Sequence, residues 1–379
     1  MLAAMKKEIA LRKDYLPALL NPPHWEEEKR VSPQREILRR SLDTLYFGGG
    51  TPSILSIDEL SELLEVVLQY YTLDVNAEIT LEANPDDLTG DYLAELLHLG
   101  FNRLSIGIQS FFDDDLQWMN RRHRVREAVQ SVKTARKQGF SNINIDLIYG
   151  LPSMNLKRWE ENLKQAIALD VSHLSAYHLT IEPRTVFGRQ QERGEVFSIP
   201  EDDSVMQFNT LLDTMEKVGY EHYEISNFAR EGFRSRHNTA YWQQRPYIGI
   251  GPAAHSFDGQ SRQWNVSNNS KYISSLTSFA SPKESDEKGE VWFEHEQLTL
   301  AEQYNDYILV SLRTAWGVDA DFIRIHFGEI IANEFLLQTA IFLQNGCMQE
   351  QAGVFTLTRK GKIIADRIAS DLFCVKVTD

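Results

Sequence analysis

The stretch Asn142–Pro152, NINIDLIYGLP, decides the fold. It is typical of a buried strand of apolar and branched residues that carries one carboxylate, Asp146, and is closed by glycine and proline. The pattern that follows, LKRWEENLKQAIAL, predicts an amphipathic helix, and HLSAYHLT predicts a second strand. A strand, a helix and a strand at this spacing indicate a βαβ unit with parallel strands.

The same unit repeats upstream. SLDTLYF, AEITLEA and RLSIGIQ each predict a strand, and helices lie between them. One helix opens with the capping-box pattern Ser56 to Glu59, and Thr89 caps another that stops at Gly100. The strands are rich in apolar and β-branched residues, which predicts a parallel sheet covered on both faces. The fold class is therefore α/β.

The flanking segments differ in character. An amphipathic helix is expected from about Met1 to Leu20, and a polar stretch follows to Arg40. One more helix is expected after Pro200, then an aromatic-rich segment at 221–257 and a polar linker at 278–290. The rest is mainly helical and ends in a strand, a turn and a helix, which indicates a winged-helix-like module. These changes predict three domains, at residues 1–200, 201–290 and 291–379.

Composition narrows the class of protein. The 379 residues are 42% hydrophobic and 25% charged, with a formal net charge of −15, which is ordinary for a folded chain. The acidic balance argues against a general affinity for nucleic acid. The chain has no apolar run of 18 residues, and its N-terminus lacks a signal-peptide core, so we expect a cytoplasmic protein.

Polar residues mark the C-terminal end of each expected parallel strand. Gly48 to Thr51 follow the first strand, and the later strands carry Glu82, Gln109, Asp146 and His178, with Thr180 just beyond. They recur about every 30 residues, the length of one βα repeat. Because a buried carboxylate is costly without partners, a set of such groups at one end of a sheet indicates a ligand site.

Each member of this set has a plainer reading. The glycines could form a tight turn, and no GK[ST] follows them, so the loop is not a Walker loop. Glu82 could cap a helix, Asp146 could pair with a buried arginine, and Gln109 could satisfy backbone groups. Arg121, in the run MNRRH, could be a solvated helix residue. Only the convergence of the whole set favours a ligand.

A family resemblance rests on motifs that stand here in order. GGGTPS, TLEANPDDL, GFNRLSIGIQSF, MNRRH, NINIDLIYGLP and LSAYHLTIEPRT resemble the radical SAM proteins of the oxygen-independent coproporphyrinogen III oxidase (HemN) group. The resemblance covers most of the chain. The segment RHNTAYW, at 236–242, together with IGIGPAAHSF, resembles the HNxxYW segment of the HemW branch.

The resemblance implies a partial parallel (β/α)6 barrel, here without its first strand, and a C-terminal, mainly helical extension. It also implies that S-adenosylmethionine (SAM) is bound. Gly49, Gly50 and Thr51 would hold its methionine end, and Arg121 its carboxylate. Glu82, Gln109 and Asp146 would bind its ribose hydroxyls and nearby polar groups, and Thr180 would lie near its adenine. A carboxylate suits vicinal hydroxyl donors, and an arginine fork suits a carboxylate.

One departure from the family is large. The family carries a CxxxCxxC loop that holds a [4Fe–4S] cluster, whereas this sequence has only Cys347 and Cys374, at no matching position. Met1 falls where the helix after that loop should be. We therefore expect a native protein that is longer and includes the loop; the alternative is a lineage that has lost the cluster. As written, the chain should hold no cluster and cleave no SAM.

The HemW resemblance implies haem binding and delivery of haem to an acceptor protein. His237 is the expected haem ligand, with His255 as its rival; Tyr241 and Trp242 would offer flat apolar surface, and Arg234 and Arg236 would pair with propionates. Membrane contact is expected only through the acceptor. Two alternatives stay open at this point: a coproporphyrinogen III oxidase that uses SAM and a [4Fe–4S] cluster, and a non-catalytic module that binds SAM or a partner.

Overall fold

Seven strands form one mixed sheet in the order β1-β2-β3-β4-β5-β7-β6. The computed structural model describes residues 1–16, 40–183, 185–195, 198–278 and 292–374. The strands are β1 (Arg40–Phe47), β2 (Tyr71–Ala83), β3 (Arg103–Gln109), β4 (Asn142–Tyr149), β5 (His173–His178), β6 (Glu221–Glu224) and β7 (Asn227–Ala229). The first five strands run parallel, which confirms the predicted partial barrel. The last two run antiparallel.

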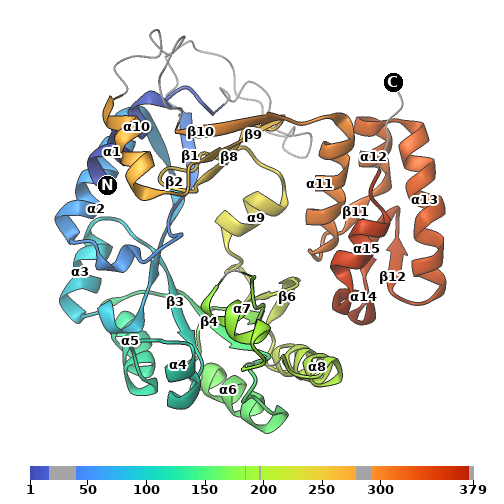
Figure 1. Ribbon diagram of the computed structural model, residues 1–379, viewed down its shortest axis with the longest axis horizontal. Coiled ribbons are helices and arrows are strands. Elements are labelled where there is room, and N and C mark those ends of the chain that lie inside the picture. The colour runs from blue at the N-terminus through green and yellow to red at the C-terminus, as the bar shows by residue number, and fades with distance from the viewer. Residues whose placement is uncertain (17–39, 184, 196–197, 279–291, 375–379) are drawn as a thin grey trace.

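Helices cover the outer side of this curved sheet (Figure 1). They are α2 (Ile57–Tyr70), α3 (Gly90–His98), α5 (Val125–Gln138), α6 (Leu156–Ala168) and α8 (Glu201–Lys217), with the shorter α4 (Asp113–Trp118). A further short helix, α7 (Val186–Glu192), follows β5. The Ser56 to Glu59 capping box begins α2 as predicted, and the Thr89 side chain caps α3. Each cap accepts a backbone N–H that the first helical turn leaves unpaired.

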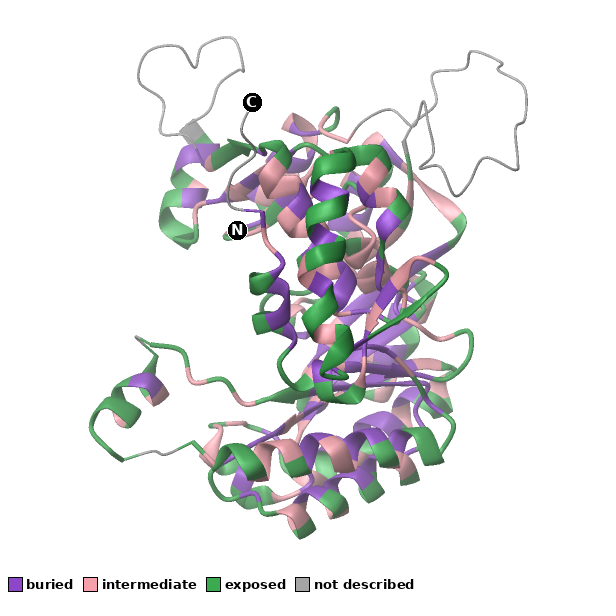
Figure 2. Cartoon of the chain, turned by 90° about the vertical axis from the view of Figure 1, so that its right-hand side faces the viewer, coloured by how far each residue is buried: buried purple, intermediate pink, exposed green. Residues whose placement is uncertain are grey.

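The strands alternate between an apolar and a polar face. The apolar residues pack into the main hydrophobic core; they include Ile79, Leu81, Leu104, Ile106, Ile143, Ile145 and Leu174. Figure 2 shows that the strands of the sheet are largely buried. The intervening residues are polar and face the inside of the barrel; they include Glu78, Thr80, Glu82, Arg103, Ser105, Asn144, Asp146, His173 and Ser175. Successive side chains of a strand point to opposite faces, so every second residue belongs to the interior.

The N-terminal helix lies beside a second, smaller sheet. Helix α1 (Leu2–Leu11) packs on α2 and on α10 (Asn269–Ser278), and it ends before the predicted Leu20. The sheet consists of β8 (His255–Phe257), β9 (Ser261–Asn265) and β10 (Phe293–Gln297). The predicted polar stretch after Leu20 and nearly all of the predicted 278–290 linker lie outside the described residues.

The C-terminal part has its own hydrophobic core. It contains α11 (Leu300–Leu312), α12 (Ala320–Phe327), α13 (Glu329–Gln344), α14 (Arg359–Ile363) and α15 (Ala365–Asp371). A three-stranded antiparallel sheet of β11 (Val318–Asp319), β13 (Val354–Leu357) and β12 (Met348–Gln351) completes it. This arrangement confirms the winged-helix-like prediction, whereas the three domain limits remain a prediction. Among the described residues, no helix is both long and apolar enough to cross a bilayer.

A buried carboxylate fastens α1 to the segment before β8. Glu8 is fully buried, and its carboxylate accepts hydrogen bonds from the Gly251 N–H at 2.9 Å and the Asn265 side-chain amide at 2.7 Å. The Tyr272 hydroxyl also donates to it, and Arg12 pairs with it at 3.1 Å. The Glu8 charge therefore joins the N-terminal helix to residues more than 240 positions away in the sequence.

We predict that Glu8→Ala lowers the free energy of unfolding by about 3–5 kcal/mol, because it leaves the buried Arg12 cation and several donors unpaired. Urea denaturation checks this. Glu65→Ala, at an exposed position of α2, is the matched control, and we expect it to change the free energy by less than about 0.5 kcal/mol. Equal effects of the two substitutions would contradict the role given to Glu8.

Candidate functional site

The glycine turn after β1 is built around Glu82. The Tyr46 hydroxyl donates to one Glu82 carboxylate oxygen at 2.6 Å, and the Gly49 N–H donates to the other at 3.1 Å. Gly49 has φ +74°, a left-handed conformation that favours glycine. A Cβ on Gly48 would lie 2.4 Å from the Tyr46 ring and 2.7 Å from the Glu82 carboxylate, so only glycine fits there. A Cβ on Gly50 would meet open space.

Arg121 and Gln109 lie together at the end of β3. The Arg121 guanidinium donates to the Asn84 side chain at 2.6 Å and to the Gly107 carbonyl at 3.4 Å. Its Nε is buried without a hydrogen-bond partner, and burial lowers its pKa. Gln109 is left-handed with φ 69°, and a Cβ on Gly107 would lie 2.8 Å from its amide nitrogen and 3.4 Å from the guanidinium. An unpaired guanidinium donor of this kind fits a ligand carboxylate.

Asp146 faces the same interior from β4. Its carboxylate accepts from the Asn144 amide at 2.8 Å and from the Ser105 hydroxyl at 3.4 Å. Burial raises its pKa from 3.8 to about 6, and the negative charge of Glu82 adds to the increase. The charge of Asp146 in turn favours the protonated form of Arg121. Asp146 therefore interacts electrostatically with both Glu82 and Arg121, which is expected for groups that share one ligand site.

The remaining residues of the predicted SAM set contribute less. Thr51 and Thr180 are both exposed, at the end of the glycine turn and beyond β5, and their roles toward SAM remain predictions. His178, which follows the sequence pattern of the strand ends, does not join the site. Its imidazole shares a hydrogen bond with the Ser204 hydroxyl of α8 and packs edge-on against Tyr149. Strand alternation explains this, because His178 lies one residue past the inward-facing Tyr177.

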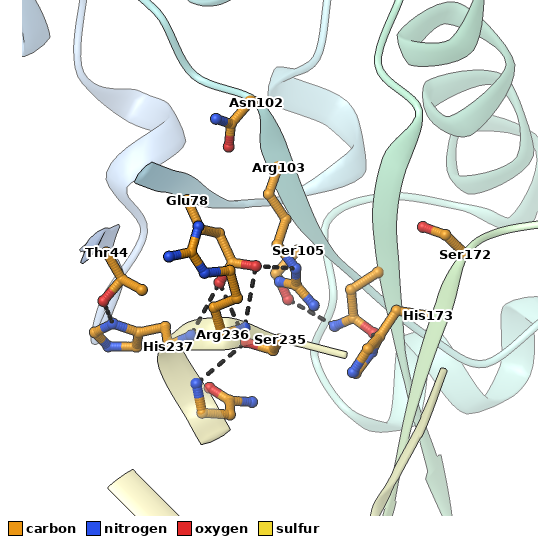
Figure 3. A network of polar contacts seen from close by, with 12 residues as sticks. Thr44, Glu78, Asn102, Arg103, Ser105, Ser172, His173, Ser235, Arg236 and His237 are labelled. Carbon is orange, nitrogen blue, oxygen red and sulfur yellow. Dashed lines mark hydrogen bonds and ion pairs between the residues drawn. The ribbon is translucent and has the colours of Figure 1, made fainter. Parts of the chain in front are cut away.

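His237 lies on α9 (Arg236–Trp242), in the space between the barrel and the C-terminal part (Figure 1). The buried Glu78 carboxylate accepts the backbone N–H groups of Arg236 at 3.1 Å and His237 at 3.0 Å, as Figure 3 shows. The same carboxylate pairs with buried Arg103 at 3.7 Å. Ser235 caps the helix. A strand of the barrel therefore fixes the start of α9.

The His237 ring is held on three sides. Its Nδ1 lies 2.9 Å from the Thr44 hydroxyl, and its Nε2 lies 2.9 Å from the Tyr241 hydroxyl. The ring stacks on Tyr46 with centroids 4.6 Å apart and an angle of 15°. Burial, with help from the Arg103 charge, lowers the pKa of His237 to about 4, so the imidazole is neutral at physiological pH. Neutral imidazole is the form that binds haem iron.

The other residues expected to surround haem are placed differently. His255 is exposed on β8 and stacks near Trp264. Arg234 pairs with Glu221, and Arg236 donates to the Asn76 carbonyl, so both predicted propionate partners already have partners of their own. Trp242 lies against the Arg313 guanidinium of the C-terminal part, with the guanidinium carbon 5.7 Å from the ring centroid.

Sequence reasoning missed a hydrogen-bonded chain that links α9 to Asp146. The Ser235 N–H lies 3.4 Å from the Tyr223 hydroxyl, which lies 2.7 Å from His173 Nε2. His173 Nδ1 lies 2.6 Å from the Asn144 side-chain oxygen, and Asn144 in turn donates to Asp146. Burial lowers the His173 pKa well below its ordinary value, so this chain is uncharged in the middle. The period-two alternation of β4 and β5 was the signal that could have found it.

The residues present fit SAM but not the family's iron–sulfur cluster. Open space above the glycine turn, two carboxylates and an arginine with a free donor match the hydroxyls and carboxylate of SAM. The two cysteines of the sequence are buried in the C-terminal core instead. Within the part of the chain that the structure describes, no group of three or more His, Cys, Asp or Glu side chains could hold a metal ion.

Comparisons with known proteins agree with this geometry. The family model of the radical SAM superfamily matches residues 22–166. The heme chaperone HemW of Bacillus subtilis is 32% identical over 343 residues, which span 90% of this chain and 88% of that protein. The heme chaperone HemW of Escherichia coli is 40% identical over 217 residues, which span 57% of this chain and 56% of that protein.

A solved structure shares the fold. The coproporphyrinogen III oxidase HemN from Escherichia coli superimposes with a TM-score of 0.77, at 22% sequence identity. The match covers 98% of this chain and 82% of that one. It supports the partial barrel with its C-terminal extension.

The raised pKa of Asp146 predicts how stability depends on pH. Because the folded pKa of about 6 exceeds the ordinary 3.8, the folded state holds more protons between these values. Ionised Asp146 therefore costs stability above pH 6, and the cost disappears as the pH falls through this window. We predict that Asp146→Asn raises the free energy of unfolding at pH 8 by about 1–3 kcal/mol and by little at pH 4. Urea denaturation at both pH values checks this, and a loss of stability at pH 8 would contradict it.

The same substitution tests the ligand site. We predict that Asp146→Asn weakens SAM binding at pH 8 by about tenfold, because one acceptor for a ligand hydroxyl loses its charge. Calorimetric titration of the whole chain checks this. Asp74→Asn, on the same strand as Glu82 but before the barrel interior, is the control and should bind SAM as the wild type does. Equal affinities of all three proteins would remove Asp146 from the site.

Proposed function

Because the chain belongs to the HemW family of radical SAM proteins, we propose that it binds haem and delivers it to an acceptor protein. The names of its relatives support this, since the matched proteins of Bacillus subtilis and Escherichia coli are both heme chaperones. Haem is the cargo in this proposal. The acceptor is a second protein, and the cytoplasmic location expected from the sequence stays a prediction.

The observation that carries the proposal is the surroundings of His237. Its two ring nitrogens have different partners, Thr44 at Nδ1 and Tyr241 at Nε2. When Nδ1 donates its proton to the Thr44 hydroxyl, the Nε2 lone pair faces Tyr241. A histidine ligand is held in this way, with one nitrogen on the metal and the other fixed by a hydrogen bond. Displacement of the Tyr241 hydroxyl would then give Nε2 to haem iron.

We further propose that the barrel interior binds SAM. Arg121, through its unpaired Nε, would hold the ligand carboxylate, and Glu82 and Asp146 would accept ribose hydroxyl protons. Gln109 and the turn Gly49–Thr51 would line the remainder, with Thr180 toward the adenine. In the family, SAM bound to a [4Fe–4S] cluster supplies a radical, but Cys347 and Cys374 do not fit such a cluster here. The proposal therefore includes binding and no cleavage step.

We predict that the protein mixed with haem gives a shifted Soret band that His237→Ala loses or strongly weakens. His255→Ala is the matched control and should keep the band, because its imidazole lies on exposed β8. Spectrophotometric titration measures both. Wild-type affinity and an unchanged spectrum in His237→Ala would show that another residue is the ligand. Conversion of coproporphyrinogen without haem binding would instead favour the oxidase.

Tyr241 gives a second, independent prediction. Its hydroxyl is hydrogen-bonded to His237 Nε2, the nitrogen that would bind haem iron. Because Tyr241→Phe removes this competing hydrogen bond, it should bind haem about 2- to 10-fold more tightly than the wild type. The phenylalanine keeps the edge-on ring contact with His237. Tyr247→Phe, which alters the next ring of the row without touching His237, is the control. Weaker haem binding by Tyr241→Phe would contradict ligation through Nε2.

A further inference from the structure

We infer that Tyr46 couples the two ligand sites, so that a SAM-type nucleoside bound at Glu82 strengthens haem binding at His237. This inference rests on the proposed function. Tyr46 is a positioning residue in this inference, because it acts on haem through His237 and on the nucleoside through Glu82.

The placement of Tyr46 follows from strand geometry. Thr44 and Tyr46 are two residues apart on β1, so both point to the inner face of the sheet. In the register of β1 with β2, Thr44 lies beside Glu78 and Tyr46 beside Thr80. Tyr46 is thus set between Glu78, which anchors the start of α9, and Glu82, which forms the SAM site.

Tyr46 has one contact on each site. Its hydroxyl donates to Glu82 at 2.6 Å, and its ring is stacked nearly parallel on the His237 imidazole. A Cβ at Gly48 would collide with both the Tyr46 ring and the Glu82 carboxylate, so the turn closes tightly over this pair. A change in the position of Glu82 therefore reaches the His237 ring through a single side chain.

The sign of the coupling follows from the capacity of a carboxylate. Two carboxylate oxygens offer about four acceptor positions. In Glu82 the structure fills one position on each oxygen, from Tyr46 and from the Gly49 N–H. Vicinal ribose hydroxyls can therefore fill the other two without displacing Tyr46. Full occupancy orders Glu82 and Tyr46, so haem meets a His237 ring that is already fixed, and its ordering cost falls.

Haem titrations of the whole chain, with and without saturating S-adenosylhomocysteine, test this inference. This analogue carries the same ribose and carboxylate. We expect the analogue to lower the haem dissociation constant of the wild type on the order of fivefold, and haem to tighten binding of the analogue by the same factor, as linkage requires. Haem binding unchanged or weakened by the analogue overturns the inference, as does failure of the analogue to bind.

Two variants separate coupling from structure. Tyr46→Phe keeps the ring on His237 and removes the hydrogen bond to Glu82, so its haem dissociation constant should be the same with and without the analogue. Tyr46→Leu removes the ring as well and should weaken haem binding itself. A full effect of the analogue in Tyr46→Phe contradicts the role of Tyr46 even where His237-dependent haem binding holds. Absence of haem binding in the wild type contradicts the proposed function instead.

Discussion

Charged and polar groups on the inner face of the sheet need partners, and this need shapes the rest of the structure. Glu78 and Arg103 are both buried there and form an ion pair. This pair alone does not fill all the acceptor positions of the Glu78 carboxylate, which need further donors because they are buried. The unpaired N–H groups at the start of α9 fill those positions. The helix that carries His237 therefore begins where a barrel carboxylate requires donors, and its own Ser235 cap marks the same point.

The three carboxylates of the interior, Glu78, Glu82 and Asp146, differ in how many of their hydrogen-bond acceptor positions are unfilled. Glu78 is saturated by α9 and Arg103, so its role is structural. Glu82 accepts two hydrogen bonds, Asp146 accepts from Asn144, Ser105 and Ser175, and both carboxylates keep spare acceptor positions. Arg121 similarly keeps one free donor. The groups with unused capacity are the ones that a nucleoside with a carboxylate would complete, and one of them, Glu82, is joined to the His237 ring through Tyr46.

The sequence pattern predicted the parallel strands, their helices and the positions of Glu82, Gln109 and Asp146, because these depend on local periodicity and on one repeat length. It failed where the answer depends on distant contacts. Tyr46 belongs to an ordinary strand pattern, and only the folded sheet brings its ring to His237, almost two hundred residues away. His178 seemed equivalent to the other strand-end residues, but its position in the alternation turns it outward to Ser204.

We propose that haem at His237 and SAM at the strand ends occupy adjacent parts of one interior. Nuclear magnetic relaxation of bound S-adenosylhomocysteine tests it most directly, because paramagnetic ferric haem broadens the resonances of nearby protons. With ferric haem bound, the ribose protons of the analogue should broaden strongly. With diamagnetic zinc protoporphyrin in its place, they should stay sharp. Equal line widths in the two samples, with both ligands bound, would show that the two ligands do not lie close together.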